Sequence, residues 1–334
     1  MKTIKKFKAV NWNTPDNDFV NVFWEQNLKQ FWIDTEYIPS KDIDSYNSLT
    51  QEMREAYIKV LAGLTLLDTI QSNIGMPYIT NHIKSLQNKS ILSFMGMMEG
   101  IHAKSYSTIF TTIESQENIN NVFKWVETNK ELQFKANKID YYYSKLLKSK
   151  VSDYDLAMAL ASSVLLESFL FYSGFFLPLW LSGQGKMVAS SDIIKKIIAD
   201  ESIHGVFVGL LFQEIFNKFD FNEKIKLKKE LNKLIDELIE NEYSYIDTIY
   251  TEIGLTSEVK EYTRYNCNKA LMNLGETLER FKVSGVNPIV LNGLNLETTQ
   301  HDFFSKKSTN YEKALEIEHL KDEDFLFDDE VIYD

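Results

Sequence analysis

Apolar residues recur at helical spacing along most of this chain, and no long stretch alternates with period two. Apolar positions three and four residues apart predict amphipathic helices, whereas strict alternation would predict strands. The sequence therefore predicts an all-α fold. Helices are expected over about residues 18–32, 49–83 and 89–113, twice within 117–149, from 153 to about 174–178, after 190, and over 223–252 and 257–282.

Capping and turn residues mark where several of these helices should begin and end. Asp153 is predicted to cap the helix that follows it, and Gly174 with Pro178 is predicted to end that helix. Gly183-Gln184-Gly185 then breaks the chain, and Ser190-Ser191-Asp192 is predicted to cap the next helix.

The pattern changes character near residue 295. Asn287-Pro288 and Asn292-Gly293 end the helical part, and beyond them charged residues dominate, interrupted by aromatic islands that include Tyr311. Such a composition favours disorder in the free chain. We therefore expect a helical domain over residues 1–294 and a flexible acidic tail over residues 295–334, whose aromatic islands dock on a partner.

One stripe of the expected helix 89–113 combines an acid, an imidazole and a phenol. Glu99, His102 and Tyr106 are three and four residues apart, and at about 100° per residue they point the same way. Their neighbours are apolar, so the stripe is expected to face the core. A buried charge needs a partner. A metal ion is one such partner.

The same Glu-x-x-His arrangement recurs at Glu201 and His204. A single copy arises often by chance and usually forms a solvated pair. Two copies in apolar helices, in a chain with only 5 His, are a stronger signal. Di-iron and di-manganese helical bundles combine this motif from each of two helices with one acid from each of two others. The motif pair therefore requires two more acids within apolar helices.

Asp68 and Glu167 meet this requirement, because apolar residues occupy every side of the helical turns that carry them. An isolated acid would ordinarily lie at a helix surface, and these surroundings argue against that position. Four carboxylates balance two divalent ions, and oxygen-rich ligation with one nitrogen per metal favours iron or manganese over zinc. The predicted ligands are Asp68, Glu99, His102, Glu167, Glu201 and His204.

Composition narrows the class of protein. The chain has 334 residues, with 44% hydrophobic residues, 13 Gly and 5 Pro, which suits one large helical core with few turns. Its 1 Cys excludes an intramolecular disulfide and fits a reducing compartment. We expect no signal peptide and no membrane span, because residues 165–181 are interrupted by Glu167, Gly174 and Pro178. These features predict a cytoplasmic protein.

The net charge of −12 is unevenly distributed. Residues 312–334 carry ten acids against two Lys, a balance of −8, which leaves −4 for the rest of the chain. An acidic surface repels phosphate groups, so nucleic acid is not an expected partner.

With six ligands placed, the pattern resembles the small, radical-generating subunit of class I ribonucleotide reductase, and is most similar to the class Ib branch. The ligands match that family in order and type, and Tyr106 matches the position of its radical-bearing tyrosine. The stretches 167–175, 268–275 and 301–305 also resemble the class Ib pattern. The resemblance covers essentially the whole chain and implies a ferritin-like bundle that holds two Mn or two Fe ions per subunit.

The resemblance also implies roles for residues around the metal site. Phe171, Phe175 and Ile197 match the apolar pocket of the tyrosyl radical. The radical-transfer path to the large subunit would run from Tyr106 past His102, Asp200 and Trp32 to Tyr311 in the tail. On the sequence alone, Trp32 is most simply a core aromatic residue. One departure is visible before Asp200, where the family commonly has Arg and this chain has Ala199.

Class Ib resemblance further implies a flavodoxin-like activase that delivers superoxide to a dimanganese site. Ser168, Tyr172 and Lys269 match positions of that oxidant channel. The implied partners are the large (alpha) subunit, which the acidic tail would bind, and a second copy in a homodimer. The ligand set accepts both manganese and iron.

Two rival functions share parts of this pattern. A ferritin-like di-metal oxidase or oxygenase acting on a small or lipid substrate would have the six ligands but would not need Tyr106, Trp32 or a docking tail. An iron-storage subunit would be shorter and would assemble into a cage, so the long tail argues against it.

Overall fold

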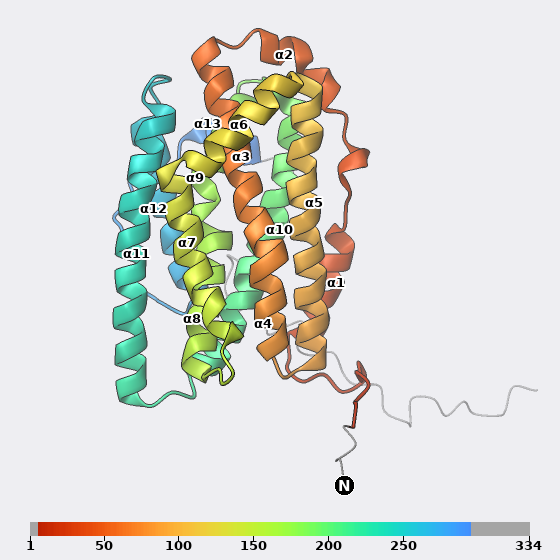
Figure 1. Cartoon of the computed structure of the whole chain (residues 1–334), viewed down its shortest axis with the longest axis vertical. Coiled ribbons are helices and arrows are strands. Elements are labelled where there is room, and N and C mark those ends of the chain that lie inside the picture. The colour runs from red at the N-terminus through yellow and green to blue at the C-terminus, as the bar shows by residue number, and fades with distance from the viewer. Residues whose placement is uncertain (1–5, 295–334) are drawn as a thin grey trace, which may run out of the picture. The chain divides into compact units, whose positions relative to one another are not determined.

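A computed structural model describes residues 6–294 of this chain (Figure 1). Within that range every regular element is a helix and no strand occurs, which confirms the predicted all-α fold. The expected docking tail over 295–334, with Tyr311, lies outside the described residues, as does the stretch 301–305.

Four long helical segments carry the acids and histidines that the sequence singles out. These are α3 (Gln51–Ile70), α5 (Leu86–Ile113), α8 (Asp153–Leu165) with its continuation η5 (Leu166–Leu170), and α10 (Val188–Phe216). α3 packs along α5, and α8 packs along α10. Figure 1 shows α3 and α5 running side by side. The four segments enclose one core.

The other helices of the described range surround this core or connect its members. They are α1 (Val20–Gln30), α2 (Ile43–Asn47), α4 (Met76–His82), α6 (Gln116–Thr128), α7 (Lys130–Ser144), α9 (Tyr172–Ser182), α11 (Phe221–Tyr250), α12 (Thr256–Asn273) and α13 (Pro288–Leu294). Short 3-10 segments are η1 (Asp34–Glu36), η2 (Pro39–Asp42) and η4 (Lys145–Leu147), and η3 (Gln71–Gly75) is π-helical, as is η5. The two helices predicted within 117–149 are α6 and α7.

Both π-helical segments lie at predicted metal ligands. η3 begins three residues after Asp68, and η5 contains Glu167. A π-helical turn inserts one extra residue into the helix and rotates the side chains that follow, and it occurs frequently at functional sites. The single helix expected over 49–83 is therefore three elements, α3, η3 and α4.

Two predicted helix starts are wrong in detail. Ser152, not Asp153, caps α8, and it forms a reciprocal capping box with Asp155. α10 begins at Val188, before the predicted cap at 190–192. Its first turn is capped by a residue far away in the sequence, because the Asp42 carboxylate accepts hydrogen bonds from the backbone amides of Ala189 (3.1 Å) and Ser190 (2.6 Å).

Two predicted helix ends are also wrong. α9 continues to Ser182 with Pro178 inside it. Gly174 allows α3 to pack closely, since a Cβ there would lie 2.8 Å from Leu64 Cγ. This packing outweighs the tendency of Gly174 and Pro178 to end a helix. α12 stops at Asn273 instead of 282, because Gly275 adopts φ +88°, the left-handed conformation that ends helices.

The segment Asp153–Ser182 is long and apolar enough to cross a membrane by length and composition alone. In the folded chain, however, 94% of its most apolar window is buried. The segment, which consists of α8, η5 and α9, is therefore part of the core, and its burial explains why it is more hydrophobic than a surface helix.

A charged pair lies in this apolar interior without belonging to the predicted metal site. Lys135 of α7 forms an ion pair with Glu242 of α11, and both side chains are buried. Ser173 Oγ donates a hydrogen bond to Glu242 (2.7 Å), and the Lys135 ammonium lies 4.1 Å from the ring centre of Tyr245. The pair therefore links α7, α9 and α11, with Glu242 Oε2 hydrogen-bonded to Ser173 and Glu242 Oε1 paired with the Lys135 ammonium.

We predict that Lys135→Met destabilises the metal-free protein by about 3–5 kcal/mol, because it leaves the Glu242 carboxylate buried and unpaired. The urea midpoint of unfolding measures the effect. The double variant Lys135→Met/Glu242→Gln should recover most of the loss, since the Gln oxygen still accepts from Ser173. A double variant as unstable as the single one would contradict this account.

Candidate metal centre

Six side chains from α3, α5, η5 and α10 meet in the middle of the bundle. They form two groups, and in each group one ligand atom from every member lies within 4.8 Å of the others. Glu99 and Glu201 belong to both groups. The first group adds Asp68 and His102, and the second adds Glu167 and His204. The structure thus brings together all six side chains that the sequence predicted as ligands.

The two histidines face the cluster with the same atom. His102 Nδ1 lies 3.0 Å from Glu201 Oε1, and His204 Nδ1 lies 2.7 Å from Glu99 Oε1. The rings are 6.1 Å apart and nearly parallel. Each histidine is one helical turn after a glutamate, so α5 and α10 each supply a matched oxygen and nitrogen to the cluster.

The chemistry of these atoms fits two metal ions. The six side chains have twelve N and O atoms, all buried, and ten of them lack a hydrogen-bond partner in the described part of the chain. Buried polar atoms in proteins are almost always hydrogen-bonded. Orphaned carboxylate oxygens and imidazole nitrogens that converge on two points are the expected inner surface of a dimetal site with oxygen-rich ligation.

The electrostatics of the cluster without metal point the same way. Burial raises the pKa of Asp68 and of Glu167 well above the ordinary values, and the neighbouring charges of Glu99 and Glu201 add to this rise. Burial alone would lower the pKa of His102, but its contacts with acids, first Asp200, raise it well above 6.5. The metal-free cluster therefore retains protons that bound cations would displace.

Tyr106 lies on α5, one turn beyond His102, and is fully buried. Its hydroxyl has no hydrogen-bond partner within residues 6–294. Burial, followed by the negative charges of Asp68, Glu201 and Glu99, raises the pKa of this phenol well above 10. Tyr106 is thus a neutral, water-shielded phenol next to the cluster.

The predicted apolar pocket residues Phe171, Phe175 and Ile197 are also completely buried. Phe171 and Phe175 lie at the junction of η5 and α9, with ring centres 5.8 Å apart, and Ile197 is on α10 one turn before Glu201. Glu167 is in η5, and Glu201 and His204 are in α10, so these apolar side chains lie on or directly after elements that carry ligands.

Asp200 connects the cluster to Trp32. Asp200 Oδ2 lies 3.0 Å from His102 Nε2 and accepts a 2.8 Å hydrogen bond from Trp32 Nε1. The Trp32 ring stacks on the His102 ring at 5.8 Å. Gln30, which the sequence did not single out, donates to Asp200 Oδ1 (3.3 Å). Ala199 adds no charge beside this chain of contacts.

The three predicted oxidant-channel residues lie along the contact between η5, α9 and α12. Ser168 Oγ accepts a 3.0 Å hydrogen bond from Asn273, which lies in the stretch 268–275 but was given no role by the sequence analysis. Tyr172 packs against Tyr262 of α12, with ring centres 5.9 Å apart. The half-buried Lys269 lies 4.8 Å from the ring centre of Tyr265 on the same helix.

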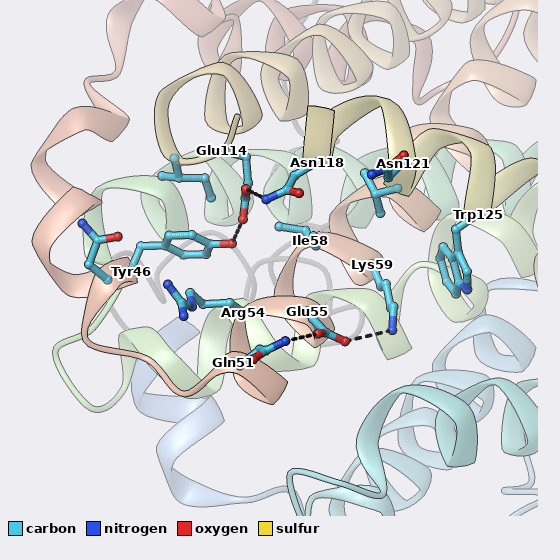
Figure 2. Close-up of a pocket in the computed structure, with 13 residues that line it drawn as sticks. Tyr46, Gln51, Arg54, Glu55, Ile58, Lys59, Glu114, Asn118, Asn121 and Trp125 are labelled. Carbon is cyan, nitrogen blue, oxygen red and sulfur yellow. Dashed lines mark hydrogen bonds and ion pairs between the residues drawn. The ribbon is translucent and has the colours of Figure 1, made fainter. Parts of the chain in front are cut away.

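A surface pocket of about 540 Å³ lies between α3, α6 and the end of α5 (Figure 2). Figure 2 shows Tyr46 pointing at Glu114, with Arg54 beneath its ring and Lys59 between Glu55 and Trp125. None of the lining residues belongs to the metal cluster or to its immediate contacts. The candidate functional site is therefore the buried cluster of six side chains and not this surface pocket.

Comparisons with known proteins agree with this geometry. Residues 9–288 match the family model described as ribonucleotide reductase, small chain. The chain is 49% identical over 327 residues to the ribonucleoside-diphosphate reductase subunit beta of Bacillus subtilis, covering 98% of both chains. It is 37% identical to the ribonucleoside-diphosphate reductase 2 subunit beta of Escherichia coli, covering 97% of this chain and 99% of that one.

A solved structure is similar as well. The dimanganese(II)-NrdF of Streptococcus sanguinis superposes with a TM-score of 0.81 at 40% sequence identity, and the match covers 86% of this chain and 100% of that chain.

We predict that raising the pH destabilises the metal-free protein. Asp68 and Glu167 hold protons more tightly in the folded chain than in the unfolded one, so folding takes up protons. The free energy of unfolding then falls as the pH rises above the unfolded carboxyl values of 3.8 and 4.5. Thermal unfolding midpoints between pH 5 and pH 8, without and with Mn²⁺, measure this.

Bound metal should remove most of the slope, because the ions replace the protons. The variant Asp68→Asn/Glu167→Gln, which cannot lose these protons, is the control and should show a flatter profile without metal. A wild-type midpoint that rises steadily with pH in the absence of metal would refute the prediction.

Proposed function

Since this chain belongs to the ribonucleotide reductase small-chain family, as the beta subunit of a ribonucleoside-diphosphate reductase, we propose that its six buried side chains bind two manganese or two iron ions and that Tyr106 carries the radical. The observation that carries this proposal is the position of a fully buried phenol without a hydrogen bond beside two sets of orphaned ligand atoms. A di-metal oxidase or oxygenase would not need such a phenol.

Held by these six side chains and exposed to an oxidant, a metal pair would supply the one-electron oxidising power that a radical on Tyr106 requires. The phenol is neutral, because burial and nearby acids raise its pKa. It must therefore release its proton as it loses the electron, and Asp68, whose charge acts most strongly on Tyr106, is the proposed acceptor. Phe171, Phe175 and Ile197 exclude the water that would quench the radical.

The radical then leaves through Asp200 and Trp32. Asp200 fixes the His102 ring through Nε2, so that Nδ1 faces the cluster, and it accepts from the Trp32 indole with the same oxygen. From Trp32 the path continues to Tyr311 in the tail over 295–334, which docks on the alpha subunit. The alpha subunit reduces the ribonucleotide.

Delivery of the oxidant involves residues of η5, α9 and α12. We assign Ser168, Tyr172 and Lys269 to a path by which a flavodoxin-like activase supplies superoxide to a dimanganese site. The similar S. sanguinis protein was solved as a dimanganese(II) form. The active molecule is proposed to be a cytoplasmic homodimer, with the helical domain over residues 1–294.

We predict that Tyr106→Phe retains both metal ions but loses the tyrosyl radical and all reductase activity. Electron paramagnetic resonance of iron-loaded, oxygen-exposed protein tests this beside the control Tyr57→Phe, which changes another fully buried tyrosine. If iron gives no signal in the wild type, the test is repeated with manganese and the activase. Undiminished activity in Tyr106→Phe, or loaded wild type without a radical in both tests, would disprove the proposal.

We further predict that Trp32→Phe keeps the tyrosyl signal and loses turnover with the alpha subunit. Phenylalanine retains an aromatic ring next to His102 but lacks the indole N–H that binds Asp200. Trp125→Phe, at the surface pocket, should leave both properties unchanged. Normal turnover by Trp32→Phe would remove Trp32 from the path.

A further inference from the structure

Two of the twelve N and O atoms in the cluster differ from the other ten because they already have a hydrogen-bond partner. One is His102 Nε2, which Asp200 holds, and the other is Glu167 Oε1. The partner of Glu167 Oε1 is the side-chain amide of Gln71, which donates to it through Nε2. Gln71 is in η3, and it has no place in the mechanism described above.

The Gln71 amide is held on all sides. Its nitrogen also donates to Ser163 Oγ (2.8 Å), and its oxygen accepts a 2.6 Å hydrogen bond from the Tyr143 hydroxyl. Gln71, Ser163, Tyr143 and Glu167 are all completely buried. In the ionised form that ligates a metal, the Glu167 carboxylate can only accept, so the amide nitrogen faces Glu167 and the amide oxygen faces Tyr143, as the structure has them. The ionised carboxylate therefore fixes the orientation of the amide.

The backbone is shaped to make room for this contact. Gln71 is the first residue of η3, and Glu167 is within η5, so both partners lie in π-helical turns. At Gly75, the last residue of η3, a Cβ would lie 2.7 Å from Tyr143 Cε2 and would collide with the Gln71 side-chain oxygen. Glycine is thus required at position 75 for the phenol and the amide to meet.

The contact makes the two metal positions unequal. Both oxygens of Asp68 are without a hydrogen bond, whereas Glu167 has only Oε2 free. Glu167 Oε2 is also the oxygen on the side of His204, 3.8 Å from its Nδ1. The amide occupies one oxygen of Glu167 and leaves the other for a cation.

We propose that Gln71 and Tyr143 are positioning residues that hold Glu167 as a one-oxygen ligand of the metal ion bound with His204. This inference rests on the proposed dimetal function. Gln71 acts directly on the carboxylate, and Tyr143 acts through Gln71. Removing a partner of this kind typically weakens metal binding about 10–100-fold.

The test is a Mn²⁺ titration of the full-length metal-free protein, in which electron paramagnetic resonance of free Mn²⁺ gives the two dissociation constants. Gln71→Met keeps the length of the side chain and removes the amide. It should weaken one of the two bound ions about 10–100-fold and leave the other within about twofold. Tyr143→Phe should weaken the same ion by a smaller factor.

Two controls separate positioning from general damage. Tyr250→Phe removes another buried hydroxyl, one that binds the Ser173 carbonyl and not the cluster, and should change neither constant. In a Glu167→Gln background the affected site is already weakened, so adding Gln71→Met should have little further effect on it.

Equal weakening of both ions, or two unchanged constants in a Gln71→Met protein with wild-type thermal stability, would overturn the positioning role. If the wild-type protein itself does not bind two ions, the proposed dimetal function is wrong, and the positioning role of Gln71 is then wrong as well. The wild-type titration therefore distinguishes the two failures.

Discussion

Four carboxylates and two imidazoles buried together impose the constraint on which the rest of this structure depends. Ionised groups at complete burial are tolerated only when they are paired or bound to metal, because the interior cannot replace the water they lose. Here the cluster has ten orphaned ligand atoms, and in the metal-free state its excess charge is met partly by retained protons. Two divalent cations balance the four carboxylates without protons.

The apolar shell follows from that constraint. A radical on Tyr106 and a set of uncompensated ligand atoms both require that water be kept away, so the helices around them are unusually hydrophobic. The segment Asp153–Ser182 is apolar enough to resemble a membrane span, and yet it is buried inside the fold. Its polar groups are placed individually, with Glu167 in the cluster and Ser173 on the separate Lys135–Glu242 pair.

The same physics explains what the sequence could predict. Each ligand is an acid or histidine surrounded by apolar residues at helical spacing. This local pattern identified all six side chains that the structure brings together. The same spacing predicted the all-α fold. Trp32 and Asp200 could be assigned only through resemblance to a family, because their contact joins residues far apart in the chain.

Structural features that depend on residues far apart in the chain could not be predicted from the local sequence pattern. The cap of α10 comes from Asp42, about 150 positions earlier, and so the helix start was misplaced. Pro178 is tolerated inside α9 because that helix is packed on every side, and π-helical turns have no distinct hydrophobic period. Gln71 was missed for the same reason, since its partners Ser163, Glu167 and Tyr143 come from other helices.

Two of the cluster's ligands are hydrogen-bonded by residues outside the cluster, His102 by Asp200 and Glu167 by Gln71, and these two contacts differ in chemistry. Asp200 is a charged group that joins His102 to the aromatic ring of Trp32, which lies next to Tyr37. Gln71 is a neutral amide whose contacts end at Ser163 and Tyr143, both completely buried. Hydrogen bonds lead to an aromatic ring on both sides, but on the His102 side a carboxylate leads to Trp32, which lies against the half-buried Tyr37, whereas on the Glu167 side a neutral amide leads to the completely buried Tyr143. The contacts on the Glu167 side thus end in the interior, where they can fix the geometry of the ligand, and those on the His102 side lead outward from the cluster.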